Sequence, residues 1–396
     1  MVLCFSLTNL ELGGAQVFVV RLANYLAKKN NQPVYIYDHW PEYRNKNTLH
    51  HLHPLVKILS YSESRFERWF IWKINAFFRL VKPGSQYRYF LNKKRMQKRL
   101  ARYNVSLVNS HMSYSDFVLS ETTLPPGCKL VITLHGEYEL SMKDPKNNPD
   151  KIRKALDKSS ALIYTAEKNL KPLDVIGYKR DIKKQKINIG FDPALFSEKK
   201  ITRAQLSLRD DEFVVGMVSR GIADKGWDTA IAAVQQYNRS AAKKITLLCI
   251  GNGTYLQQLV EDAADANIRL QQFEENYQDY FYCYPLFDIF IFPTRFEGES
   301  VPNVLIECLY WGVPIVASHH AEIPAMLRCG TEQEAGICVE AGTIPLVTAF
   351  TTALSTLVSD QALRLKLSSN SAAAFKAFSM EGVAACYEKF FNEVRS

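Results

Sequence analysis

The chain has 396 residues, which is too long for one ordinary hydrophobic core and predicts two domains of roughly 200 residues each. Hydrophobic residues make up 47% and charged residues 22%, a composition that excludes a disordered or fibrous protein. The formal net charge of +9 is concentrated in one segment, because residues 65–102 contain twelve Lys or Arg and a single acid, Glu67. The rest of the chain is therefore close to neutral.

The first half of the chain alternates strand-like and helical patterns. Strand-like runs are expected at 2–8, 34–39, 105–111, 129–136, 160–166 and 186–190, and a helix at 15–29 follows a turn at Gly13-Gly14. An apolar strand at the start, with no basic stretch before it, argues against a secretory signal and for a cytoplasmic protein. No apolar run reaches the ~18 residues that span a bilayer.

The second half repeats this scheme, with strands expected at 213–219, 244–251, 288–294, 313–318 and 336–340. Strands without strict polar alternation, each followed by a helix, predict an α/β fold of two doubly wound parallel sheets. The pattern breaks at 190–203, so we expect one domain at 1–190 and another at 191–379, with a last helix at 380–396 crossing back to the first. A ligand is expected in the cleft between them, at the carboxyl ends of the strands.

The eight cysteines are scattered, and no two form a C-x-x-C pair. Several lie inside apolar runs, so we expect free thiols in a reducing cytosol rather than disulfides or zinc ligands. These are Cys4, Cys128, Cys249, Cys283, Cys308, Cys329, Cys338 and Cys386.

The richest stretch for chemistry is 288–318, where a buried strand is followed by a polar loop and a helix at 303–311. Pro302 is suited to begin this helix and Gly312 to end it. Glu299 lies in the loop and Glu307 one turn inside the helix, so both can face one cleft beside backbone N–H groups that suit a phosphate. Taken alone, the pair is explained equally well as a solvated loop acid and a surface helix residue.

A second group follows the strand at 213–219, where Arg220 and Lys225 flank the start of a helix. Two cations at this place suit a doubly charged diphosphate, although two ordinary surface cations would give the same pattern. His135 ends another strand, and His111 has the same placement, but a single histidine is more often structural. The chain contains no Asp-x-Asp pair, so a divalent metal has no obvious ligand set.

Five segments in this order resemble the retaining glycosyltransferases of family 4, which have the GT-B fold of two Rossmann-like domains facing across a cleft. They are LELGGAQ, TLHG, NIGFD, SRGIADKG and EGESVPNVLIECLYWGVPIVAS, and the last holds the Glu-x7-Glu signature as Glu299 and Glu307. The resemblance covers most of the chain apart from about 40–105 and 140–180. It implies a metal-independent hexosyltransferase that needs no cofactor and takes a nucleotide-sugar donor, with a UDP-sugar favoured and a GDP-sugar as the alternative.

The resemblance also implies roles for single residues. Arg220 and Lys225 would stabilise the leaving diphosphate, Glu299 would bind the donor sugar and Glu307 the ribose. His135 would contact the sugar, and glycine or backbone positions would line the donor and acceptor: Gly13, Gly14, Ser300, Val301, Asn303 and Val304. Two positions depart from the family pattern: Pro302 has no N–H to donate, and Gln16 stands where an acid is frequent.

The basic segment 65–102 also holds nine aromatic residues. Such a mixture suits an anionic membrane surface at the inner face of the cytoplasmic membrane, or a glycan or lipid-linked acceptor for polysaccharide or lipopolysaccharide synthesis. Two ordinary amphipathic helices remain the plain alternative, and no motif supports nucleic-acid binding. Two rival functions stay open on the same architecture, a sugar-nucleotide epimerase and a non-catalytic nucleotide-sugar binding protein.

Overall fold

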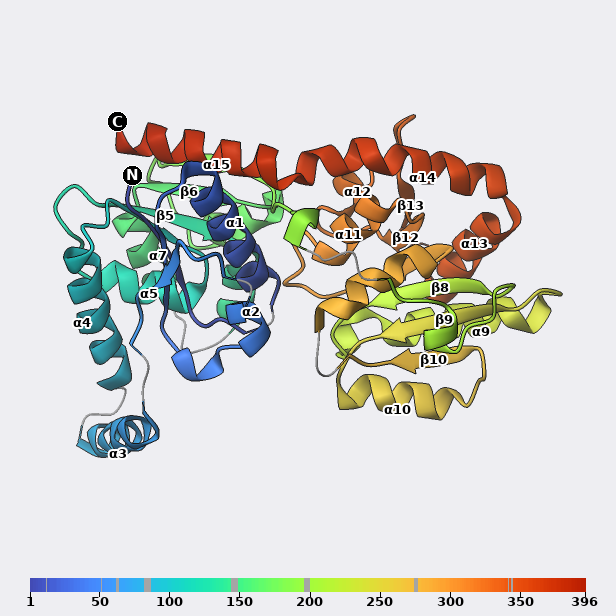
Figure 1. Cartoon of the computed structure of the whole chain (residues 1–396), viewed down its shortest axis with the longest axis horizontal. Helices are drawn as coiled ribbons and strands as arrows, with labels where there is room; N and C mark the ends of the chain where they lie inside the picture. Colours follow the sequence, from blue (N-terminus) through green and yellow to red (C-terminus); the bar gives the residue numbers. More distant parts are fainter. Residues whose placement is uncertain are drawn as a thin grey trace. The chain divides into compact units, whose positions relative to one another are not determined.

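The structure is a computed structural model, and it describes residues 1–11, 13–50, 52–61, 64–81, 87–143, 149–195, 200–273, 277–340, 342 and 345–396 (Figure 1). The chain divides into two compact units. The first contains residues Met1–Asp192 and Met380–Ser396, and the second contains Pro193–Ser379. Each unit is built around one parallel sheet, which confirms the predicted α/β class.

The sheet of the first unit has the order β3-β2-β1-β4-β5-β6-β7, with every pair parallel. Its strands are β1 Leu3–Leu7, β2 Val34–Asp38, β3 Val56–Ile58, β4 Leu107–Ser110, β5 Lys129–Leu134, β6 Ala161–Tyr164 and β7 Lys183–Lys186. Strand β3 was not expected from the sequence, and β7 ends where the expected strand 186–190 begins. Both lie at sheet edges, where the apolar run that identifies a buried strand is not needed.

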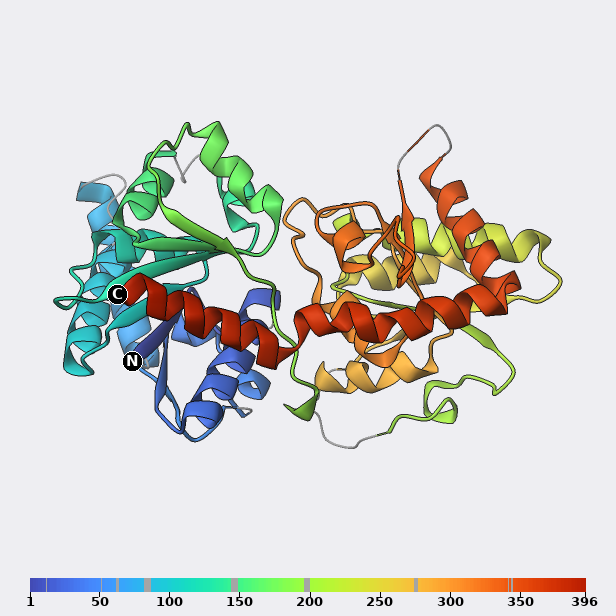
Figure 2. The same ribbon diagram turned by 90° about the horizontal axis from the view of Figure 1, so that it is seen from above.

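Helices cover both faces of this sheet. The α-helices of the unit are α1 Gly14–Asn30, α2 Lys46–His50, α3 Arg65–Val81, α4 Tyr87–Arg102, α5 Ser113–Glu121, α6 Glu137–Ser141, α7 Pro149–Lys158, α8 Lys171–Val175 and α15 Met380–Arg395. Residues of α4, α5 and α7 share one apolar core with alternate residues of the strands, for example Met96, Phe117 and Leu156. Helix α15 lies along α1 (Figures 1 and 2), where Lys29 pairs with Glu388 at 2.6 Å.

The sheet of the second unit has the order β10-β9-β8-β11-β12-β13, again all parallel. Its strands are β8 Phe213–Val218, β9 Ile245–Ile250, β10 Ile268–Gln271, β11 Ile289–Phe292, β12 Ile315–Ser318 and β13 Gly336–Val339, of which β10 was not expected. Its α-helices are α9 Trp227–Ser240, α10 Thr254–Ala263, α11 Asn303–Trp311, α12 Ile323–Met326, α13 Leu346–Ser359 and α14 Gln361–Phe375.

The strand orders give each sheet one switch point. In the second unit the chain builds outward from β8 to β10, then returns to β11 on the other side of β8. The loops after β8 and β11 therefore follow the switch point of the sheet, which is where ligands commonly bind in open parallel sheets. In the first unit the corresponding strands are β1 and β4.

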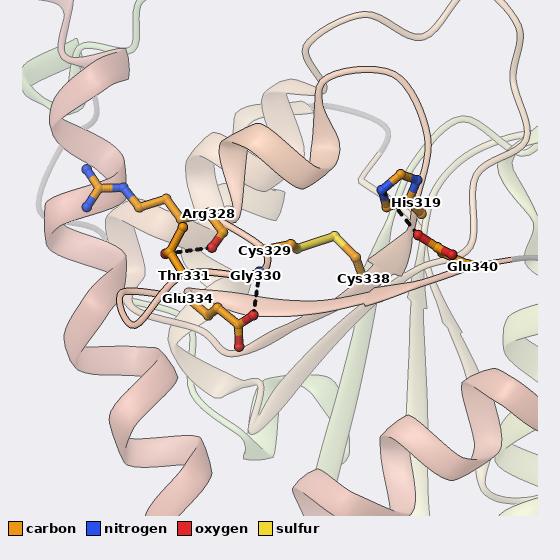
Figure 3. Close-up of a disulfide and its surroundings, with 8 residues drawn as sticks. All are labelled: His319, Arg328, Cys329, Gly330, Thr331, Glu334, Cys338 and Glu340. Carbon is orange, nitrogen blue, oxygen red and sulfur yellow. Dashed lines mark hydrogen bonds and ion pairs between the residues drawn. A yellow bond between two sulfur atoms is a disulfide. The ribbon is translucent and has the colours of Figure 1, made fainter.

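The expectation that all cysteines are free thiols is wrong for two of them, because Cys329 and Cys338 form a disulfide (Figure 3). The segment between them folds back on itself. The Ala335 N–H donates to the Leu327 carbonyl at 2.9 Å, and the Gly330 N–H donates to the Glu334 carboxylate at 2.6 Å. This turn brings the two Cα atoms to 6.5 Å, which the sequence spacing alone did not indicate. The other six cysteines are free.

A buried carboxyl in the first unit makes stability depend on pH. Asp116 of α5 is 2% exposed and accepts a hydrogen bond from the Tyr138 hydroxyl at 3.0 Å. Burial raises the pKa of Asp116 to about 7. Because the folded chain then holds a proton that the unfolded chain has lost, this group makes stability fall as pH rises from 4 to 7.

We expect Asp116→Asn to remove this fall. The free energy of unfolding of the wild type should drop, relative to the variant, by up to about 1.4 kcal/mol per pH unit in that window and then level off. Urea unfolding of both proteins between pH 4 and 8 measures the difference. Parallel pH profiles for the two proteins would show that Asp116 ionises normally.

Candidate active site

Three of the predicted site residues meet at the switch point of the second unit. Arg220 and Lys225 lie in the loop after β8, and Glu299 lies in the loop after β11. Lys225 and Glu299 are only 7% and 8% exposed, whereas the Arg220 side chain is exposed. The interpretation of Lys225 and Glu299 as solvated surface charges is therefore excluded, because the two side chains are buried beside each other.

The centre of this group is an ion pair. The Lys225 ammonium lies 2.5 Å from the Oε2 atom of Glu299, and the Thr294 hydroxyl donates to the same oxygen at 3.3 Å. Charges that are buried this far are costly unless they are paired, so each side chain fixes the other. A polar ligand that approaches here meets a cation and a carboxylate that are already desolvated.

Arg220 and Lys225 both contact the ring of Phe296. The Phe296 ring centroid lies 4.6 Å from the Lys225 ammonium and 5.3 Å from the Arg220 guanidinium carbon. Cations are attracted to the negative face of an aromatic ring, so Phe296 holds two like charges near each other. The arrangement concentrates positive charge at the end of β8 beside one carboxylate.

The loop after β8 can reach this place because of its glycines. Gly226 has φ of +80°, and a Cβ there would lie 2.7 Å from the Pro293 carbonyl carbon, with the oxygen nearer still. The loop 219–226 therefore touches the backbone at the end of β11 directly. The Trp227 indole is fully buried and donates to the Arg220 carbonyl at 2.8 Å, which anchors the loop to the core.

The segment predicted to surround a donor lies between Glu299 and the body of α11. Ser300 and Val301 are buried, and Pro302 caps the helix with an extended backbone. Asn303 and Val304 form its first turn and are partly exposed. Helix α11 begins and ends where the sequence predicted, with Gly312 as a left-handed C-cap at φ of +69°.

Glu307 has surroundings of its own. It is fully buried in α11, where the Tyr280 hydroxyl donates to Oε1 at 2.9 Å and the Tyr284 hydroxyl to Oε2 at 2.8 Å. Both tyrosines belong to a 3₁₀-helix, η6 Tyr277–Leu286, that precedes β11. The alternative of a surface helix residue is thus excluded, but a ligand can reach this carboxylate only after a neighbour moves.

The remaining predicted residues belong to the first unit. Gly13 is the N-cap of α1, the helix after β1, and Gly14 is the first residue of that helix. The Gln16 amide lies under Gly13, is 8% exposed and donates to the Asn9 side chain at 3.0 Å. Gln16, which stands where the family pattern frequently has an acid, is therefore a buried residue that packs against Gly13 and binds Asn9.

His135 follows β5 and pairs with His111, which follows β4. The His111 Nδ1 and His135 Nε2 atoms are 2.9 Å apart, and the His111 Nε2 atom lies 2.7 Å from the Asn109 side-chain oxygen. Burial lowers the pKa of His135 to about 4 and that of His111 well below its usual range. Both rings are therefore neutral at physiological pH.

Reasoning from the sequence missed the partners of the predicted residues. Phe296, Thr294, Tyr280 and Tyr284 carry no motif, and the aromatic run at 280–284 is typical of an ordinary core. Only the strand order and the fold of η6 bring them to the charged residues. Among the residues that the structure describes, no group of three or more His, Cys, Asp or Glu is placed to hold a metal ion.

Comparisons with known proteins identify the class. Residues 12–170 match the family model described as Glycosyltransferase Family 4, and residues 212–360 match the model described as Glycosyl transferases group 1. Together these matches cover more than half of the chain. The chain belongs to the glycosyltransferases that these two models describe.

A relative and several structures are similar to this chain. Over 158 residues it is 31% identical to the GDP-mannose-dependent monoacylated alpha-(1-6)-phosphatidylinositol monomannoside mannosyltransferase of Corynebacterium glutamicum. That alignment covers 38% of this chain and 40% of the relative, so the chain spans well under half of the relative's length by this match.

The similar structures share the fold over nearly the whole chain. HepE of Anabaena in complex with UDP-glucose is 16% identical with a TM-score of 0.75, covering 99% of this chain and 100% of that one. WaaG, a glycosyltransferase involved in lipopolysaccharide biosynthesis, is 13% identical with a TM-score of 0.69, covering 97% and 98%. The expected GT-B architecture is confirmed by these likenesses.

Proposed function

We propose that the protein is a retaining hexosyltransferase that transfers a sugar from a nucleotide-sugar donor to a glycan or lipid-linked acceptor of a surface polysaccharide or lipopolysaccharide. The observation that carries this proposal is the buried Lys225–Glu299 pair beside Arg220 at the switch point of the second unit. A diphosphate needs preorganised cations, and a sugar needs a fixed carboxylate to accept from its hydroxyls. The site supplies the cations, Arg220 and Lys225, and the carboxylate, Glu299, close together at the end of β8.

The donor would be a UDP-sugar, with a GDP-sugar as the alternative. UDP-glucose binding by HepE supports the first, and the name of the Corynebacterium relative, a GDP-mannose-dependent enzyme, supports the second. In this proposal Arg220 and Lys225 stabilise the departing diphosphate, while Glu299 binds the sugar and Glu307 the ribose. The backbone at Ser300–Val304 would line the sugar and phosphates. In the first unit, Gly13 and Gly14 would line the acceptor side and His135 would contact a sugar.

The Lys225–Glu299 pair suggests how the donor would engage. A diphosphate competes with Glu299 for the Lys225 ammonium, and a sugar hydroxyl can then replace the ammonium as the partner of the carboxylate. No side-chain nucleophile is assigned, since the leaving phosphate can itself take the proton of the acceptor. The two exchanges would link recognition of the phosphates to recognition of the sugar.

Thermal unfolding with UDP-, GDP- and ADP-sugars tests the proposed function. A bound donor stabilises the fold by RT ln(1 + [L]/Kd), so one nucleotide series should raise Tm. Glu299→Gln should not reduce the shift caused by the nucleoside diphosphate, because Lys225 loses its competing partner, but it should reduce the shift caused by the sugar nucleotide. The proposal fails if no sugar nucleotide shifts Tm, or if a bound donor is returned as an epimer with no sugar transferred or hydrolysed.

We also propose that the donor is bound without a divalent metal or other cofactor. The support is the set of cations at the end of β8 together with the missing Asp-x-Asp motif. The same thermal shifts should therefore persist in excess EDTA. Shifts that vanish with the chelator and return with Mg²⁺ would contradict this part of the proposal.

A further part of the proposal is peripheral binding to the inner face of the cytoplasmic membrane through α3 and α4. In the described part of the chain no helix is long and apolar enough to cross a bilayer. Helix α3 packs on α4, and Ile71 of α3 is buried. At about 100° per residue, five exposed apolar side chains fall within an arc of about 100° on α3; they are Phe66, Trp69, Phe70, Phe77 and Leu80.

Basic side chains accompany this apolar face. The Lys73 ammonium lies over the Trp69 and Trp72 rings, at 5.7 and 5.3 Å from their centroids. Lys94 and Lys98 are exposed on α4, whereas Lys93 and Arg95 form ion pairs with Glu121 and Glu67. Apolar rings beside lysines are suited to insert among the headgroups of an anionic leaflet.

We expect Phe66→Ser/Phe70→Ser/Phe77→Ser to abolish the binding to anionic vesicles that survives high salt. Salt screens the lysines, since the Debye length falls to about 3 Å at 1 M, but it leaves ring insertion intact. Vesicle co-sedimentation at low and high salt measures both parts. Val175→Ser/Leu365→Ser, which removes two side chains that are equally exposed elsewhere, is the matched control. Equal binding of the triple variant and the control would refute this docking surface.

A further inference from the structure

Both carboxylate oxygens of Glu307 already accept hydrogen bonds, so a ribose can bind there only if one donor moves away. The carboxylate proposed to bind the ribose is 0% exposed, and tyrosine hydroxyls donate to both of its oxygens. A buried carboxylate without such donors would be strongly destabilising. The tyrosines therefore keep Glu307 in place when no nucleotide is bound, and one of them must give way when a ribose arrives.

The two tyrosines are not equivalent. Tyr284 is 0% exposed, and its ring packs against Phe287 and Phe290 with centroids 5.6 and 5.8 Å apart. Burial and the nearby Glu307 charge raise the pKa of Tyr284 well above its usual range, so its hydroxyl stays a donor. Any movement of this ring would open a cavity in the aromatic core of the second unit.

Tyr280 lies one turn earlier in η6 and is 7% exposed, so its ring reaches the edge of the core. Its ring meets that of Tyr284 edge-on, with centroids 6.2 Å apart. Moving Tyr280 would break its hydrogen bond to Oε1 of Glu307 and leave the Tyr284 bond to Oε2 intact. Oε1 is thus the atom that a ligand hydroxyl can reach at the smaller structural cost.

We propose that Tyr280 is an exchangeable placeholder for a ribose hydroxyl, whereas Tyr284 is the fixed positioning residue of Glu307. On nucleotide binding the Tyr280 hydroxyl leaves Oε1 and a ribose hydroxyl donates there instead. When the nucleoside diphosphate departs, Tyr280 returns and the carboxylate is never left buried without that donor. The inference rests on the proposed function, because it assumes that a nucleotide binds at α11.

This exchange has a measurable consequence. In the wild type a ribose hydroxyl replaces one hydrogen bond by another, so the nucleotide gains little from it. Tyr280→Phe removes the competing donor, and we expect UDP to bind roughly five-fold more tightly, the effect of one net hydrogen bond. The gain should disappear with 2′,3′-dideoxy-UDP, which has no hydroxyl to donate. If the wild type binds GDP instead, GDP and its dideoxy analogue take their places.

Tyr284→Phe should act in the opposite direction. It should weaken UDP roughly five-fold or more, because Glu307 loses the donor that positions it. Tyr237→Phe, the same chemical change on α9, is the control and should leave Kd unchanged. Calorimetric titration of the four proteins with both ligands measures these effects.

Two outcomes would overturn the placeholder role. One is weaker or unchanged UDP binding by Tyr280→Phe, including a loss equal to that of Tyr284→Phe. The other is an equal gain for UDP and 2′,3′-dideoxy-UDP. A wild-type protein that binds none of UDP, GDP and ADP gives a different result, because it overturns the proposed function and this inference with it. The two failures are therefore distinguishable.

Discussion

Arg220→Ala should lower kcat/KM for sugar transfer by about 10²–10³, the effect of removing one preorganised group that stabilises developing charge. The guanidinium is exposed and lies on the Phe296 ring, so it can meet a diphosphate without first being released from a buried ion pair. For the same reason the free energy of unfolding should change by less than about 0.5 kcal/mol. Initial rates with the donor found in the thermal-shift series, together with Tm, separate the two effects.

Arg209→Ala is the matched control for this prediction. Arg209 is an arginine of the same unit with a side chain that is 72% exposed. It pairs with the exposed Asp211 at 3.1 Å and with Glu212 at 3.3 Å, a buried carboxylate that Arg269 also holds at 3.0 Å. Its removal should leave kcat/KM within about two-fold of the wild type, because Glu212 keeps Arg269 as its partner and the exposed pair with Asp211 contributes little. Equal losses in the two variants would mean that general charge, not the position of Arg220, attracts the donor.

Gly226→Ala should destabilise the second unit by more than about 4 kcal/mol, because two separate penalties coincide. The backbone has φ of +80°, and the new Cβ would overlap the Pro293 carbonyl at the end of β11. The loop that carries Arg220 and Lys225 would have to move away from the loop that carries Glu299. Calorimetric unfolding should show a large loss of Tm, and the Lys225–Glu299 pair should be disrupted in any protein that still folds.

Gly330→Ala is the control that measures the cost of the left-handed backbone conformation alone, without a steric overlap. Gly330 has nearly the same φ, +78°, but nothing lies within 4 Å of a Cβ built there. Its substitution should therefore cost only about 1–2 kcal/mol. If Gly226→Ala is no more destabilising than Gly330→Ala, the two loops are not in contact as the structure has them.

The sequence predicted those parts of the fold and site that depend on local pattern. Buried strands in both sheets and the bounds of α11 follow from apolar runs, Pro302 and Gly312, and their order places Arg220 and Glu299 at strand ends. The edge strands β3 and β10 were missed, because short edge strands lack a long apolar run. The disulfide was missed, because it depends on a turn at 328–335 that no cysteine spacing reveals.

Pairings between distant segments could not be predicted. Lys225 and Glu299 are 74 residues apart, and Tyr280 lies 27 residues before Glu307. Their contacts depend on the sheet order and on the path of η6, which are properties of the packed chain. A family signature identified both glutamates, but only the structure shows that Glu299 is buried in an ion pair with Lys225, whereas Glu307 accepts hydrogen bonds from two tyrosines.

The most direct test of the central claim is ³¹P NMR of sugar nucleotides with the protein, carried out in excess EDTA. The diphosphate resonances report on the atoms that Arg220 and Lys225 are proposed to hold. We predict that the resonances of one sugar nucleotide, UDP-linked or GDP-linked, broaden with the wild type and slowly give way to those of the free nucleoside diphosphate. Arg220→Ala should show neither effect, while Arg209→Ala should show both. Unchanged spectra of UDP-, GDP- and ADP-sugars with the wild type would contradict the account.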